Sequence, residues 1–151
     1  MEKELYFEDF AIDQQFTSGG YTISKERAIA FARDYDPQYF HIDEEAAKAS
    51  IFGKLAVSGL LTASASMRLK IDSPLSRVAG GLVGLGMESI KWPVPVYPGD
   101  TLRIVITITG KRLSKSNPDK GVVYYRIDTF NQHDVLVMEM STAVLVPRRE
   151  K

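Results

Sequence analysis

A change in the spacing of apolar residues, close to Ser73-Pro74, constrains this 151-residue sequence more than any other feature. Before this point the apolar residues recur at the three- and four-residue intervals of helices, and after it they alternate with polar residues as in strands. Helices followed by strands indicate an α+β fold with an antiparallel sheet. The length fits a single domain over residues 1–151, and no repeat or linker divides it.

Two helices are predicted around a proline-containing corner. Ser24 is an N-cap candidate for a helix that runs to about Tyr35. The helix should end there because Pro37 disfavours a helical conformation of the residue before it. Asp43 can cap a second, short helix over residues 44–49.

A third helix is expected to lie in the core. It begins near Ser58-Gly59 and runs to about Lys70, and residues 60–67 within it are all small or apolar. A helix that is apolar on all sides is usually buried on all sides. Gly84 and Gly86 fall in the next extended stretch, where glycine often marks close approach of another backbone, and this helix is the expected neighbour.

The second half of the chain predicts a sheet. Alternation is clearest over residues 101–109, which indicates a strand with one wet face. The other expected strands cover residues 16–23, 82–94, 122–130 and 135–146, with a hairpin turn at 131–134. A nearly apolar helix wrapped by a curved antiparallel sheet of about five strands is the hot-dog architecture, although a roll of another topology fits almost as well.

Composition excludes several classes of protein. Lys plus Arg and Asp plus Glu number 19 each, so the basic excess of a nucleic-acid-binding protein is missing. The lack of cysteine excludes a disulfide framework and a thiolate metal site, and two distant histidines do not suggest a metal enzyme. No signal peptide and no span of about 20 apolar residues is present, so we expect a cytoplasmic protein without a membrane partner.

Asp36 and His41 are the candidate catalytic pair. On a continuous helix their side chains would point about 140° apart, but Pro37 bends the chain between them and allows them to converge. A carboxylate and an imidazole in a partly apolar pocket can activate water, because each exchanges protons near neutral pH. The alternatives remain open: a structural histidine beside Phe40, and a carboxylate that bonds its own turn. His133 lies in a polar turn and is expected to be solvated.

The run from Tyr35 to His41, Tyr-Asp-Pro-Gln-Tyr-Phe-His, resembles the motif of MaoC-like, R-specific enoyl-CoA hydratases, Asp-x-Asn-Pro-aliphatic-His. The Asp and the His stand at the family's spacing, but Gln38 replaces the Asn and Tyr39 replaces the Pro. Similar segments follow the family in the same order at residues 6–10, 51–60, 92–100 and 145–149. The resemblance therefore covers most of the chain and implies the hot-dog fold.

The resemblance also implies an activity, namely reversible addition of water to the α,β double bond of an acyl-CoA thioester. It assigns Asp36 and His41 to hold the water and exchange protons with it, without deciding which is base and which is acid. It assigns the backbone N–H of Gly59, at a helix start, to the thioester oxyanion. The alternative is that Gly59 only lets the helix begin against the sheet. The candidate substrate contacts are Gln38, Phe40 and Ser58.

Partners and cofactors follow from the same resemblance. Coenzyme A is expected as part of the substrate, with no separate cofactor and no metal. The polar loop around Lys115 and Lys120 is expected to be solvated and not to bind the coenzyme. By analogy with hot-dog domains of this length, we expect a homodimer or a dimer of dimers.

Two other functions remain open. A hot-dog acyl-CoA thioesterase would direct water to the thioester carbon, and the Asp-to-His spacing favours the hydratase over it. A non-catalytic subunit that binds an acyl ligand would keep the fold. The departure at Tyr39 favours that alternative, as does Met67, which stands where some family members carry a polar side chain. The length and branching of the acyl chain are not indicated.

Overall fold

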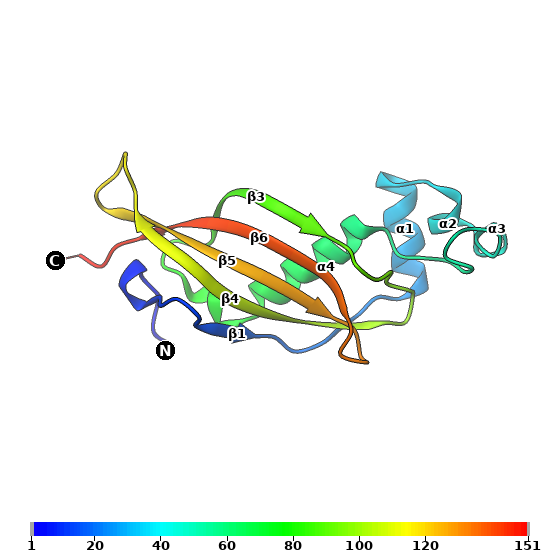
Figure 1. Cartoon of the computed structure of the whole chain (residues 1–151), viewed down its shortest axis with the longest axis horizontal. Coiled ribbons are helices and arrows are strands. Elements are labelled where there is room, and N and C mark those ends of the chain that lie inside the picture. The colour runs from blue at the N-terminus through cyan, green and yellow to red at the C-terminus, as the bar shows by residue number, and fades with distance from the viewer. Residues whose placement is uncertain (1, 151) are drawn as a thin grey trace.

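The computed structural model describes residues 2–150, which form helices at one end and a long sheet (Figure 1). In chain order the elements are η1 (Phe7–Asp9), β1 (Gln15–Thr17), β2 (Tyr21–Thr22), α1 (Lys25–Tyr35), α2 (Tyr39–Ile42), α3 (Glu44–Ala47), α4 (Gly59–Ile71), η2 (Pro74–Arg77), β3 (Val83–Lys91), β4 (Thr101–Leu113), β5 (Lys120–Phe130) and β6 (Leu136–Pro147). Within residues 2–150 there is no helix whose length and apolar content would let it cross a bilayer.

The sheet is antiparallel, with strand order β1-β4-β5-β6-β3, and β2 also pairs with β4. Its strands run along α4 and curve over it, while α1, α2 and α3 lie beyond one end of the sheet (Figure 1). The short helix η1 and the end of β6 lie at the opposite end of the sheet (Figure 1). The predicted α+β arrangement, one helix against a curved antiparallel sheet, is confirmed.

Alternation along the strands builds the core. Ile106 of β4 pairs with Ile127 of β5, which pairs with Met140 of β6, and all three side chains are fully buried. The helix contributes buried residues four apart, namely Leu61, Ala65 and Leu69. Burial of each large side chain contributes about 1.5 to 3 kcal/mol, so this layer supplies much of the stability.

The two predicted helix caps are present. Ser24 Oγ accepts a hydrogen bond of 3.1 Å from the Arg27 N–H at the start of α1. Asp43 Oδ1 accepts one of 3.0 Å from the Ala46 N–H at the start of α3. That helix ends at Ala47, two residues earlier than predicted, because the chain continues in a series of turns.

The prediction that the long helix is buried on all sides is wrong. Leu60, Met67 and Ile71 of α4 are 55%, 39% and 46% exposed, and they share a face that points away from the sheet. Small and apolar residues indicate that a helix surface will be buried. Within this chain, however, the sheet buries only one face of α4.

The role predicted for Gly84 and Gly86 is also wrong. A Cβ atom built on either glycine would have no neighbour within 4 Å, so no backbone approaches closely. The register between β3 and β6 shifts between these residues, and Gly86 has φ of 153°. The bulge requires a positive φ at position 86, which glycine adopts readily. This requirement explains why Gly86 is a glycine.

The first strand is divided in two. Instead of one strand over residues 16–23, β1 and β2 pair separately with β4, which makes six strands where five were expected. Ser18 lies between them, and its Oγ accepts a hydrogen bond of 2.9 Å from the Ile104 N–H. This side chain replaces a ladder bond where the strand is interrupted.

A buried hydrogen bond links the end of α4 to the sheet. Lys70 Nζ lies 3.0 Å from the Tyr125 hydroxyl, and both side chains are almost fully buried. Burial lowers the pKa of Lys70 and raises the pKa of Tyr125 to about 12.

We expect Ile106→Ala to lower the free energy of unfolding by about 2 to 5 kcal/mol, because it leaves a cavity between α4 and the sheet. Val105→Ala is the matched control, since Val105 is only partly buried on the other face of the same strand. It should cost about 1 kcal/mol or less. Urea unfolding measures both, and equal losses would contradict the strand register.

Candidate active site

The candidate site forms where α1 ends. The Asp36 N–H donates to the Ala32 carbonyl and closes α1, and the next residue is Pro37. The chain then enters the one-turn helix α2, in which His41 lies. Sequence patterns did not predict α2, because a single turn is too short to show a helical period.

Asp36 and His41 converge at this corner. His41 Nε2 lies 3.3 Å from Asp36 Oδ2. The imidazole is buried, whereas the Asp36 side chain keeps 23% of its surface exposed. The bend at Pro37 thus brings together two groups that a continuous helix would hold apart.

The orientation of the His41 ring is set by a backbone carbonyl. His41 Nδ1 lies 2.7 Å from the Ala56 carbonyl oxygen. Because a carbonyl oxygen can only accept, Nδ1 carries a proton and donates it. Nε2 is therefore the nitrogen that faces Asp36 and can gain or lose a proton.

Two side chains donate hydrogen bonds to the Asp36 carboxylate. Ser58 Oγ donates to Oδ2 at 2.7 Å, and Gln38 Nε2 donates to Oδ1 at 2.6 Å. Burial acts to raise the pKa of Asp36, but these hydrogen bonds and the nearby His41 outweigh it and hold the pKa below its usual value. Asp36 is therefore ionised at neutral pH.

The start of α4 forms the other wall of the site. Ser58 is the N-cap residue, but its side chain bonds Asp36 and makes no capping bond to the helix. Among the described residues no acceptor is found for the N–H of Gly59, the first residue of α4. An N–H at a helix start carries partial positive charge and suits an anionic oxygen.

A cavity of about 350 Å³ joins these groups. Asp36, His41 and Gly59 line it together with Trp92. The remaining lining residues are Phe52, Val57, Ser58, Leu60, Thr62, Val94, Pro95 and Val96. A mainly apolar cavity with a few polar groups at one end is typical of a small-molecule site.

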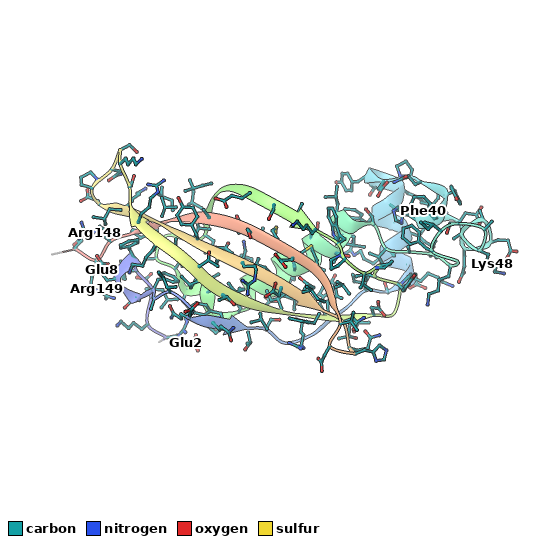
Figure 2. The ribbon with its side chains drawn as sticks, viewed as in Figure 1. Glu2, Glu8, Phe40, Lys48, Arg148 and Arg149 are labelled. Carbon is teal, nitrogen blue, oxygen red and sulfur yellow. The ribbon has the colours of Figure 1, made fainter. Side chains whose placement is uncertain are left out.

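The three residues predicted to contact the substrate lie in different places. Gln38 and Ser58 are beside Asp36 and already bond its carboxylate. Phe40, labelled in Figure 2 among the helices at one end of the sheet, is outside the cavity lining. Its ring packs edge-on against His41 and Phe52, with ring centroids 4.5 Å and 5.1 Å away. Its observed contacts hold the imidazole in place.

Three further residues lie away from the cavity. Tyr39 is exposed and packs on the neighbouring Phe40 ring. Met67 is on the exposed face of α4, so the departure from the family at this position falls outside the cavity lining. The loop between β4 and β5, which contains Lys115, lies at the opposite end of the sheet from α1–α3 (Figure 1).

Two site features were missed from the sequence. The Ala56 carbonyl acts through its backbone, so no residue type reveals it. Trp92 donates from Nε1 to the Gly59 carbonyl at 3.0 Å. Trp92 is the single tryptophan of the chain, which could have drawn attention to it. Its position in the sequence, however, does not connect it to any other site residue. No group of three or more His, Asp or Glu side chains within residues 2–150 is arranged to hold a metal ion.

Comparison with known proteins gives consistent results. The family model described as "MaoC like domain" matches residues 9–130. An uncharacterized protein of Bacillus subtilis is 30% identical over 95% of this chain and 100% of its own length. An (R)-specific enoyl-CoA hydratase of Rhodospirillum rubrum is 30% identical over 95% of this chain and 93% of its own.

A solved structure supports the fold. The crystal structure of a MaoC-like dehydratase from Rhodospirillum rubrum is 41% identical to this chain, with a TM-score of 0.91. The superposition covers 97% of this chain and 99% of that one. The hot-dog fold expected from the sequence is confirmed.

We expect Ser58→Ala to raise the pKa of Asp36, because it removes a donor that stabilises the carboxylate. Carboxyl-carbon NMR titration of the folded protein measures this pKa. A lowered folded-state pKa contributes stability that is complete above the usual carboxyl value of about 3.9 and is lost as the pH falls through the lowered value. Ser58→Ala should therefore also reduce this acid-dependent part of the unfolding free energy.

The matched control is Ser64→Ala, since Ser64 Oγ is exposed and donates to the Leu60 carbonyl of the same helix. It should leave the Asp36 titration unchanged. An Asp36 pKa that is the same in Ser58→Ala and in the unaltered protein would show that the Ser58 hydroxyl does not stabilise the carboxylate.

Proposed function

The chain belongs to the MaoC-like dehydratase family, and we propose that it adds water reversibly to the α,β double bond of an acyl-CoA thioester. Membership establishes a hydratase or dehydratase of this family. The enoyl-CoA substrate is supported by the R. rubrum relative, which is named an (R)-specific enoyl-CoA hydratase. The observation that carries the proposal is the Asp36–His41 pair, 3.3 Å apart, which lines one cavity together with Gly59.

In this proposal water is held between Asp36 Oδ2 and His41 Nε2. Asp36 is ionised, because hydrogen bonds hold its pKa below the usual value, so its carboxylate is available to accept a proton from the water. His41 Nε2 is the only ring nitrogen left to bind the water, because Nδ1 donates to the Ala56 carbonyl. The pair removes a proton from the water as its oxygen attacks carbon β.

The thioester oxygen takes up the negative charge of the transition state. As the C–O bond forms at carbon β, the π electrons move through carbon α to the thioester oxygen and form an enolate. In the proposed pose the Gly59 N–H donates to this oxygen, aided by the positive end of the α4 dipole. Carbon α then takes a proton back from the pair, so the enzyme ends the cycle unchanged, and the reverse sequence removes water.

We expect the protein to convert crotonyl-CoA into 3-hydroxybutyryl-CoA, with loss of the enoyl absorbance as the measurement. Asp36→Asn and His41→Ala should each lower kcat by about 10²- to 10⁴-fold, because each removes half of the proton-transfer pair. An assay over enoyl chain lengths, with methyl-branched and dicarboxylic substrates included, then defines the acyl group.

The matched controls are Asp34→Asn and His133→Ala, which change exposed residues of the same types outside the cavity. Both should retain normal turnover. Free coenzyme A without a 3-hydroxyacyl product would indicate a thioesterase instead. No turnover of any substrate would favour a non-catalytic acyl-binding subunit.

An exposed apolar surface supports the proposal of a homodimer. It joins the free face of α4 to β3, where Val83, Leu85 and Met87 are more than half exposed. Between them lies a groove of about 600 Å³, lined by Phe31, Tyr35, Leu60, Ala63, Ser64, Met67 and Met87. β3 pairs only with β6 among the described strands, so one edge of the sheet is open. We propose that a second copy covers this surface beside the catalytic cavity, with which it shares Leu60.

We expect Met67→Glu to convert the dimer into a monomer, because it places a charge at the centre of this apolar surface. Light scattering after size-exclusion chromatography measures the molar mass. Ile12→Glu is the control, since Ile12 is 61% exposed but lies outside the surface. A monomeric unaltered protein, or a Met67→Glu variant that remains dimeric, would contradict the proposal.

A further inference from the structure

The Trp92 side chain lies against the first residue of α4. It follows β3 in the connection to β4, and its Nε1 donates to the Gly59 carbonyl oxygen at 3.0 Å. A Cβ atom at position 59 would come within 2.7 Å of Trp92 Cε2 and 3.1 Å of Cδ2. The indole therefore occupies the space that any side chain at this position would need.

The indole explains why position 59 is glycine. Gly59 is not among the glycines with positive φ, so its backbone conformation is open to other residues. Alanine is normally preferred to glycine in a helix. Contact with Trp92, and not backbone geometry, is what excludes a side chain here.

Two hydrogen bonds join the approach to α4 with the connection between β3 and β4. The Val57 N–H donates to the Val96 carbonyl at 2.8 Å, and Trp92 donates to the Gly59 carbonyl. The Ser58–Gly59 peptide unit lies between these two attachments, and it carries the Gly59 N–H, for which no acceptor is found among the described residues. The Ser58 hydroxyl ties the same unit to Asp36.

We propose that Trp92 is a positioning residue, which fixes the first turn of α4 so that the Gly59 N–H is held at a set place relative to the Asp36–His41 pair. This inference rests on the proposed hydratase function, in which that N–H binds the thioester oxygen. Trp92 acts through Gly59: it restrains the carbonyl by a hydrogen bond and the Cα by contact. Donors that are fixed before the charge develops stabilise an oxyanion most effectively.

The first experiment is Trp92→Phe, which keeps an aromatic ring and removes the N–H donor. We expect kcat with crotonyl-CoA to fall roughly three- to tenfold, the effect of one lost hydrogen bond, while KM changes less than twofold. The pH profile of kcat/KM should keep its shape, because the Asp36–His41 pair is unaltered. The control is Tyr124→Phe, which also removes one polar group from an aromatic side chain. The Tyr124 hydroxyl accepts a hydrogen bond from Arg112 Nε on the outer face of the sheet, so this variant should keep full activity.

The second experiment combines Gly59→Ala with Trp92→Leu and does not depend on turnover. In the unaltered background Gly59→Ala should lower the thermal midpoint by roughly 3 to 10 °C, because its methyl group overlaps the indole. In the Trp92→Leu background the same change should have little effect or raise the midpoint. An equal loss in both backgrounds would overturn the inference, since the glycine would then be needed for another reason.

The two experiments separate this inference from the proposed function. If the unaltered protein hydrates crotonyl-CoA and Trp92→Phe has the same kcat, the positioning role is wrong and the hydratase function stands. If the unaltered protein shows no turnover but Gly59 and Trp92 remain coupled, the hydratase function is wrong and the restraint of the first turn is supported.

Trp92 is the single tryptophan of the chain and lines the cavity, so its fluorescence should change when crotonyl-CoA binds there.

Discussion

The hydrogen bond from Ser58 Oγ to Asp36 Oδ2 joins the end of α1 to the start of α4, two points 22 residues apart in the chain. On one side of it His41 is held by the Ala56 carbonyl, and on the other the first turn of α4 is held by Trp92. The proposed water-activating pair and the proposed oxyanion donor therefore share one short connection. Loss of this bond would raise the pKa of Asp36 and loosen the placement of both groups relative to each other.

The electrostatics of the site follow from unequal burial. His41 is buried and has a backbone acceptor on one nitrogen, whereas Asp36 is partly exposed and receives hydrogen bonds on both oxygens. These donors outweigh the burial that would raise the Asp36 pKa and keep the carboxylate charged. The charged and polar groups Asp36, His41 and Ser58 therefore lie close together in the wall of a mainly apolar cavity.

Helix α4 lies between the candidate active site and the surface proposed for the homodimer. Its inner face packs on the sheet, and its outer face exposes Leu60, Met67 and Ile71. Leu60 lines both the catalytic cavity and the apolar groove beside β3. In the proposed homodimer, a second copy would cover the outer face, and the cavity would lie next to the contact between the two chains.

The sequence by itself determined the α+β class, the ends of α1, the caps at Ser24 and Asp43, and the pairing of Asp36 with His41. These depend on local rules of period, capping and proline geometry, which act over a few residues. Only the tertiary structure decided that Gln38 and Ser58 bond Asp36, that the Ala56 carbonyl orients His41, and that Trp92 covers Gly59. The exposed face of α4 and the bulge at Gly86 belong to the same group. Each depends on which distant segment lies alongside, and a residue's type does not reveal its neighbour across the fold.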